Sequence, residues 1–269
     1  MSNTKYCIIA CIAAAQAAGV AAWAQTTYSY QITQDTYIDS GNSTLNYGTG
    51  STLKVVDSTT PCNTLFELPA SLFSSYSPSS IQSAIVSFYA FQTNGHLLAG
   101  YNNITLYPLT QAFVEGTGGK NGAAGAGATW LTYDGINSWA SPGGDYDAQN
   151  SVADILASSV VYNGTNVFVQ PGDAPNGAVF VTFNITPLLN NPTADAELQD
   201  NGALLTLGSG ANPQSYVTFP SANTTGASDS APYRPLLDVT VVPEPSSLLL
   251  VVLGTAATAC LLKKRDTRH

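Results

Sequence analysis

The sequence predicts an all-β fold, a jelly-roll-type β-sandwich, with a signal peptide before it and a single transmembrane helix after it. Three observations favour this class. Residues 25–241 are rich in Thr, Ser, Asn, Gly, Tyr and Val and poor in charged helix formers, a composition that disfavours helix. Many short stretches alternate apolar and polar residues with a period of two. Polar turn clusters separate these stretches, as in sandwiches.

The first 24 residues have the features of a secretory signal peptide. Lys5 precedes an apolar stretch at residues 7–20, and Ala22, Trp23 and Ala24 form a small-residue cleavage pattern before Gln25. The chain is therefore expected to be exported through the inner membrane.

The predicted domain contains several stretches that alternate over one face. In the clearest, Val179, Val181 and Phe183 share a face, and in another Ala84, Val86 and Phe88 do so. The same pattern predicts strands at residues 104–107, 203–207 and 237–241. One helix is expected at residues 151–159, from the helical spacing of apolar residues there. Residues 116–128 are expected to be a flexible loop, and residues 221–232 a polar loop.

Charge and cysteine content limit the classes of partner. Between residues 25 and 242 the bases are Lys54, Lys120 and Arg234, whereas all acidic residues except Glu244 and Asp266 lie there. This acidic balance disfavours nucleic acid and anionic membranes and suits calcium or neutral polymers, although solubility outside the cell explains it equally well. Cys62 is the single cysteine of this span, so no disulfide is expected within it.

The chain ends in a three-part segment at residues 242–269. Pro243, Glu244 and Pro245 come first, an apolar stretch follows at about 246–262, and basic residues 263–265 close it. The apolar stretch is close to the roughly 17–25 residues of a membrane span, and the basic end is expected to stay in the cytoplasm.

This order of elements resembles the PEP-CTERM sorting signal of Gram-negative bacteria. The resemblance implies recognition and cleavage near Pro243, Glu244 and Pro245 by a membrane-embedded exosortase. The protein would be held in the membrane transiently and then pass to the outer surface or the extracellular matrix. The alternative is an ordinary C-terminal anchor with a proline spacer.

An aromatic and acidic segment at residues 128–147 is the main candidate for function. It contains both tryptophans that follow the signal peptide, Trp130 and Trp139, together with two tyrosines and three aspartates. Aromatic faces can stack on sugar rings, and carboxylates can accept bonds from hydroxyls or bind calcium. The alternative is that the tryptophans pin a long loop to the core, because tryptophans of β domains are usually packed.

The domain also resembles the DNRLRE, or disaggregatase-related, domain, a carbohydrate-binding module of the jelly-roll type. The matching pieces occur in order at residues 35–38, 46–48, 53–55, 65–69, 81–84, 106–110, 115–118, 130–147, 183–186, 201–202 and 234–236. Asn63 and Thr64 stand where the family often carries arginine, and the name-giving hexapeptide is absent. Both departures leave a ligand contact by that arginine unsupported.

The resemblance implies polysaccharide binding with bound calcium. The residues it points to as sugar contacts are Trp130, Tyr133, Trp139 and Tyr146. As calcium ligands it points to Asp145 and Asp147, with Asp35 as a third. Calcium needs six to eight oxygen ligands, so solvated turn aspartates are the alternative.

Catalysis has few residues to work with, and we expect no enzyme. His96 and His269 are the only histidines, and no nucleophile motif surrounds a serine. One cysteine and one usable histidine cannot complete a zinc site. A glycosidase would need two carboxylates at a set separation; Glu67 and Glu115 could be proposed, but the sequence gives no reason to bring them together. The sequence thus predicts a surface or matrix protein that binds extracellular polysaccharide. Its alternatives are a structural matrix protein without a defined ligand and a polysaccharide hydrolase or lyase.

Overall fold

The structure is a computed structural model, and it describes residues 25–90, 92–93, 104–125, 127–156, 167–168, 179–208, 215–224 and 234–242. The predicted signal peptide and the sorting tail, with Pro243, Glu244, Pro245 and the expected transmembrane helix, lie outside the described residues. Among the helices of the described part, none is long and apolar enough to cross a membrane.

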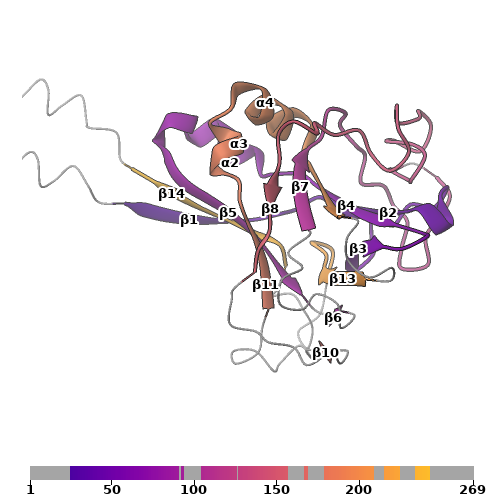
Figure 1. Cartoon of the computed structure of the whole chain (residues 1–269). Coiled ribbons are helices and arrows are strands. Elements are labelled where there is room, and N and C mark those ends of the chain that lie inside the picture. The colour runs from indigo at the N-terminus through magenta and orange to yellow at the C-terminus, as the bar shows by residue number, and fades with distance from the viewer. Residues whose placement is uncertain are drawn as a thin grey trace, which may run out of the picture.

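Two antiparallel sheets form the body of the molecule (Figure 1). The order of the first sheet is β1-β14-β5-β11-β9. Its strands are β1 (Thr26–Gln31), β14 (Leu236–Val241), β5 (Ile81–Ala90), β11 (Val179–Asn184) and β9 (Ile155–Leu156). The second sheet runs β10-β6-β13-β3-β4-β12-β7-β8, and β2 pairs with β4 outside this path. Its strands are β10 (Val167–Phe168), β6 (Gln92–Thr93), β13 (Ser215–Pro220), β3 (Thr52–Asp57), β4 (Cys62–Phe66), β12 (Ala203–Leu207), β7 (Ile104–Pro108), β8 (Val152–Ala153) and β2 (Asp35–Asp39). The all-β prediction is confirmed.

The main core combines side chains from both sheets. Val86 and Phe88 of β5 and Phe183 of β11 are fully buried in it, as the alternation predicted. Phe88 meets Phe66 of the second sheet edge-on, with ring centroids 5.2 Å apart. Apolar burial of this kind stabilises the fold by about 25 cal/mol per Å². The strands expected at residues 203–207 and 237–241 are present as β12 and β14.

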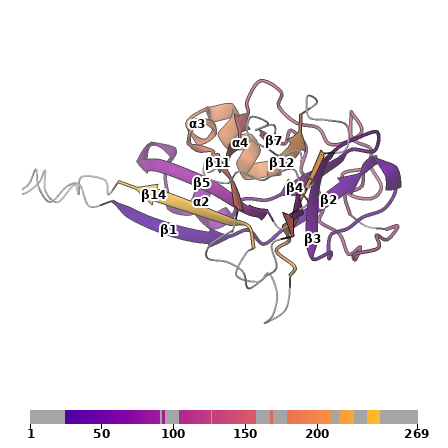
Figure 2. The same cartoon turned by 60° about the horizontal axis from the view of Figure 1, so that its bottom comes forward.

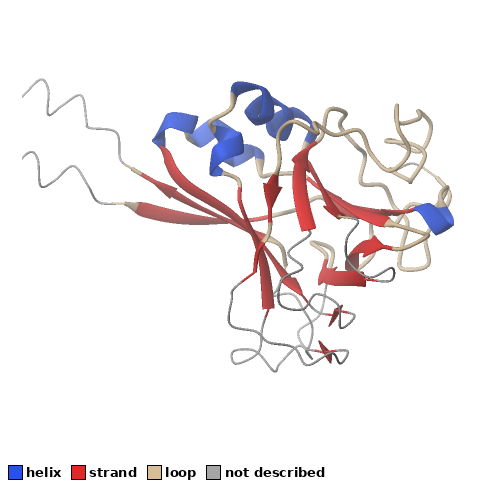
Figure 3. Cartoon of the chain, viewed as in Figure 1, coloured by secondary structure: helices blue, strands red, loops and turns tan. Residues whose placement is uncertain are grey.

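In the described part of the chain, three α-helices and two short 3-10 helices interrupt the strands, more helix than the composition predicted. Figure 3 shows the helices among the strands. They are η1 (Ser40–Asn42), α2 (Ala70–Ser75), η2 (Pro78–Ser80), α3 (Thr186–Leu189) and α4 (Pro192–Asn201). The prediction of a helix at residues 151–159 is wrong for the described residues 151–156, which form β8 and β9. The spacing that imitated a helix arises because the chain crosses here from the second sheet to the first, where β8 pairs with β7 and β9 with β11.

Residues 109–147 form a layer on the outer face of the second sheet. Their apolar side chains build a second core with Ile38, Leu65 and Leu204 of that sheet. The flexible loop expected at residues 116–128 is irregular but fastened in its described parts, because Asn46 holds it from both sides. The side-chain amide of Asn46 donates to the carbonyls of Glu115 (2.7 Å) and Ala128 (2.8 Å), and its oxygen accepts from the N–H of Gly118 (2.8 Å).

The two ends of the described domain lie side by side. β1 and β14 are antiparallel neighbours, and Thr26 is paired with Val241. Figure 2 shows both strands reaching the same end of the first sheet. In Figure 1 the loops of residues 109–147 lie on the opposite side of the fold.

Candidate functional site

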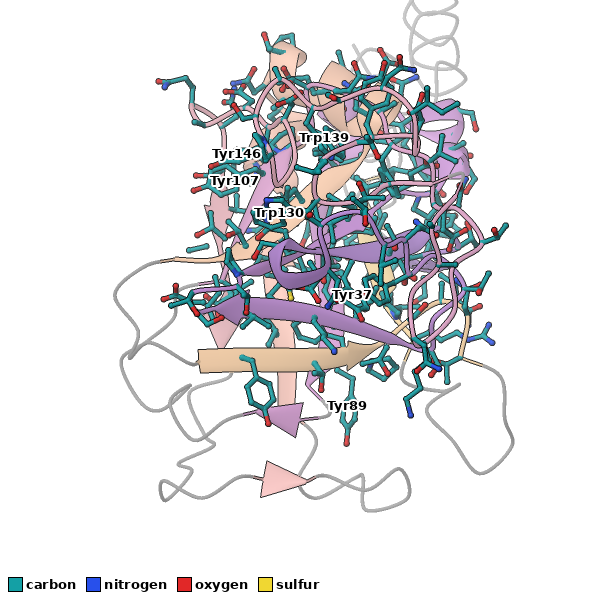
Figure 4. All side chains as sticks on the ribbon, turned by 90° about the vertical axis from the view of Figure 1, so that its right-hand side faces the viewer. Tyr37, Tyr89, Tyr107, Trp130, Trp139 and Tyr146 are labelled. Carbon is teal, nitrogen blue, oxygen red and sulfur yellow. The ribbon has the colours of Figure 1, made fainter. Side chains whose placement is uncertain are left out.

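A tyrosine pair is the most accessible aromatic feature of the outer layer. Tyr107 belongs to β7, and Tyr146 lies on a short extended segment that is fastened to the end of β7. The N–H of Asp147 donates to the carbonyl of Pro108 (2.9 Å), and the N–H of Thr110 to that of Asp145 (3.0 Å). The two rings are 4.6 Å apart at an angle of 43°, and Tyr146 is 41% exposed. Figure 4 shows them together on one side of the molecule.

Trp139 lies in the interior of the outer layer. It is only 4% exposed, and its indole N–H donates to the carbonyl of Thr129 at 2.9 Å. Tyr133 packs edge-on against it, with centroids 5.8 Å apart. Both rings belong to the second core or pack against it. Of the two interpretations that the sequence left open for Trp139, this position matches the pinning of a loop.

Trp130 is half-buried and lies over a glycine turn. The N–H of Gly143 donates to the carbonyl of Trp130 at 2.8 Å. A Cβ at Gly143, where φ is +101°, would come within 2.9 Å of the indole ring. A Cβ at Gly144, where φ is +107°, would come within 2.6 Å of the Leu204 side chain. The glycines are therefore needed for the turn to reach the sheet beneath the indole, and Trp130 keeps part of its ring toward solvent.

The three aspartates proposed for calcium do not come together. No group of three acidic, histidine or cysteine side chains suited to a metal occurs in the described part of the chain. The carboxylate of Asp145 accepts from the backbone N–H groups of Ala140 (2.7 Å) and Ser141 (2.8 Å). Asp147 accepts from Gln149 N–H (2.8 Å), and Asp35 is buried elsewhere. As a set, these three residues therefore do not fit a calcium site.

Asp147 instead meets Glu197 of α4, a residue that sequence reasoning missed because its helix was not predicted. The two acids lie close enough for each to affect the pKa of the other. Burial raises the pKa of Glu197, and the neighbouring Asp147 raises it further. The pKa of Asp147 is lowered by its bonds from the Asn150 side chain and Gln149 N–H. The bonds that Asp147 receives therefore favour its ionised form.

A buried polar network forms around Asp35, the first residue of β2. This carboxylate is fully buried and accepts from the Ser221 hydroxyl (2.6 Å) and Ala222 N–H (2.8 Å). The Glu115 carboxylate accepts from Asp35 N–H (3.2 Å) and from the Asn223 amide (2.7 Å). Burial raises the pKa of Asp35 to about 6 despite these bonds.

Several short motifs behind the DNRLRE resemblance meet in this network. Asp35 opens one of them, Asn46 another and Glu115 a third. Asn46 holds Glu115 through its carbonyl (2.7 Å), and Arg234, which opens a fourth, lies close enough to Asp35 to lower its pKa. Arg234 itself donates to the Thr224 carbonyl through Nε at 3.1 Å. These motifs thus serve to join distant loops.

Glu67 and Glu115, the acids considered for a glycosidase, are near each other. Burial raises the pKa of Glu67, and Glu115 adds to the shift. Glu67 accepts from the Gln34 amide at 2.9 Å, whereas Glu115 takes part in the network around Asp35. Their partners are amides of the fold, and neither approaches the tyrosine pair in any contact of the described residues.

Asp154 is a further acid that the sequence did not single out. It is 5% exposed and lies between β8 and β9, where the chain crosses between the sheets. Neither carboxylate oxygen receives a well-formed hydrogen bond from a described residue. Burial raises its pKa to about 6. Burial of a carboxylate without hydrogen-bond partners costs free energy, so the stability of the fold is expected to depend on the ionisation of Asp154.

The comparisons with known proteins give no family for this chain. No protein-family model and no curated protein matches it. Function therefore has to be argued from the residues themselves.

Proposed function

We propose that this protein is an exported surface or matrix protein that binds extracellular polysaccharide, without catalysis, through a surface centred on Tyr146 and Tyr107. The observation that carries the proposal is the tyrosine pair, in which Tyr146 is exposed and Tyr107 is half-buried, and in which the residues on both sides of Tyr146 are hydrogen-bonded to the end of β7 and the residues just after it. A flat ring presented on a fixed backbone can stack on a sugar with little loss of conformational entropy. The half-buried ring of Trp130 extends the same layer.

The proposal includes a jelly-roll-type arrangement of the two sheets and export with tail processing. Support for export comes from the sequence pattern at residues 1–24 and 242–269. Thr26 and Val241 are paired, so a leader and an anchor would be attached at one end of the first sheet. The layer with Tyr146 lies on the opposite side (Figure 1). An anchored domain would then present this layer away from the membrane. An exosortase in the membrane could cleave the tail without disturbing the layer.

Polysaccharide binding is tested by removing the exposed ring. The full-length chain, in a detergent without sugar head groups, is titrated with a panel of bacterial and algal polysaccharides, and then compared as Tyr146→Ala. Loss of one stacking contact is expected to weaken binding on the order of tenfold, which corresponds to ~1.4 kcal/mol.

Tyr28→Ala is the matched control, because Tyr28 is also exposed (42%) and pairs with Tyr76 at 5.5 Å, but on the first sheet. Equal losses in both variants, or no binding by the unaltered chain, would contradict the proposal.

A structural matrix protein without a defined ligand is the second candidate. The burial of Trp139 and its bond to Thr129 favour it, because the most aromatic segment then serves to hold its own loop. Absence of saturable binding across the whole panel would make this the better description.

A further inference from the structure

The tyrosine pair is surrounded by acidic groups. Asp145 and Asp147 flank Tyr146 in the chain, and Glu197 of α4 lies close enough to Asp147 for its pKa to be raised by it. Successive Cα atoms are about 3.8 Å apart, so the Cα atoms of both aspartates lie within a Debye length, about 8 Å at physiological salt, of the Cα atom of Tyr146. The bonds that Asp147 receives keep it ionised. A ligand on the tyrosine rings therefore enters a negative local field.

Among the described residues, no lysine or arginine contacts the tyrosine pair or its acids. The three bases between residues 25 and 242 are Lys54, Lys120 and Arg234. The Lys54 ammonium lies 5.1 Å from the ring centroid of Tyr37, and Arg234 donates to Thr224 in the network around Asp35. Lys120 is in the exposed part of the loop that Asn46 fastens. None of the three contacts the tyrosine pair or its acids in the described structure.

We infer that the ligand of this surface is an uncharged polysaccharide, and that the surface rejects polymers of uronic acids. The inference rests on the proposed function and narrows it to a substrate class. Uncharged sugar rings stack on tyrosine through their C–H faces, and the surrounding carboxylates and amides accept or donate bonds to hydroxyl groups. A uronate has the same rings but brings a carboxylate close to Asp147 without a cation to balance it.

The test compares one polymer in two charge states. A polyuronate and the same polymer after reduction of its carboxyl groups to alcohols are titrated against the full-length chain at low salt and at 1 M salt, where the Debye length shrinks to about 3 Å. The reduced polymer is expected to bind at both salt concentrations. The polyuronate is expected to bind at least about tenfold more weakly at low salt and to recover at high salt.

Asp147→Asn tests whether the local acids cause the selectivity. Removal of one charge near the rings is expected to raise the ratio of polyuronate to reduced-polymer affinity about two- to fivefold at low salt. Asp57→Asn, on β3, changes the net charge equally and should leave the ratio unchanged. An unchanged ratio in Asp147→Asn would overturn the inference.

The remaining outcomes separate the inference from the function on which it rests. Tighter binding of the polyuronate than of the reduced polymer, lost in Tyr146→Ala, would overturn the uncharged class but keep the polysaccharide-binding surface. Binding of neither polymer, nor of any neutral polymer in the panel, would remove the proposed function itself.

Discussion

Asp154 has a buried carboxyl group whose ionisation at neutral pH is unfavourable in the folded chain. Its pKa rises from 3.8 to about 6 because the carboxyl is buried. Between those two pH values the folded chain holds a proton that the unfolded chain has released. The free energy of unfolding therefore falls as pH rises through this window. Two pKa units correspond to about 3 kcal/mol, lost by pH 7.

Replacement of Asp154 by the isosteric Asn should remove this penalty. At pH 7.5 the free energy of unfolding is expected to rise by about 1–3 kcal/mol, and its decline between pH 4 and 7 should flatten. Chemical denaturation of both proteins across that pH range measures the effect. Asp57→Asn controls for net charge. A destabilised Asp154→Asn at pH 7.5 would mean that the carboxylate has a favourable partner.

Asp35 has a similar pKa, about 6, for the same first reason, burial, yet it differs in its partners. Ser221 and Ala222 both donate to it, so an Asn there could not accept both bonds. The comparison illustrates what sequence can give for single residues. It placed Asp35, Asp145 and Asp147 among the important acids, but their partners lie up to 187 positions away, and no local pattern specifies such partners.

At the scale of elements, period-two alternation predicted the core strands well because each such strand has one face in the core. Prediction failed where tertiary packing decides. Val152 and Ile155 looked helical in spacing because they belong to two different sheets. Helix α4 was not predicted because the helix-poor composition of the domain was given more weight than the helix start and stop residues in the local sequence. Asn191 precedes Pro192 as an N-cap, and Gly202 ends the helix at φ +84°.

Asn191 links α4 to the segment that bears Tyr146. Its oxygen accepts from the N–H of Thr193 at 3.0 Å, and its amide donates to the Asn150 side chain at 2.7 Å. Asn191→Ala is expected to lower the free energy of unfolding by about 1–2 kcal/mol through loss of the cap.

Thermal or chemical denaturation measures this loss. Asn190→Ala is the neighbouring control, because the Asn190 side chain is exposed and makes no described side-chain hydrogen bond. Equal stability of the unaltered chain and Asn191→Ala would contradict the capping role.

At the scale of the whole molecule, the pairing of Thr26 with Val241 bears on the proposed removal of the tail. β14 is bonded on both sides, by β1 and β5, and it ends at Val241, just before Pro243, Glu244 and Pro245. Proline cannot donate a ladder hydrogen bond, so the two prolines favour the end of the strand at this point. A cut in or after this motif would leave both sheets intact, and release would not require unfolding.

Replacement of Pro243, Glu244 and Pro245 by alanine should therefore block processing without affecting the fold. In the native host the altered chain is expected to stay in the membrane fraction at its uncut mass, whereas the unaltered chain is shortened and reaches the surface or matrix. Ser246→Ala with Ser247→Ala is the control, because it changes adjacent tail residues but keeps the motif. Fractionation with mass measurement distinguishes the cases. Surface release of the alanine variant at the normal rate and mass would contradict a role of these three residues in processing. Retention of both chains in the membrane at uncut mass would instead indicate an ordinary anchor.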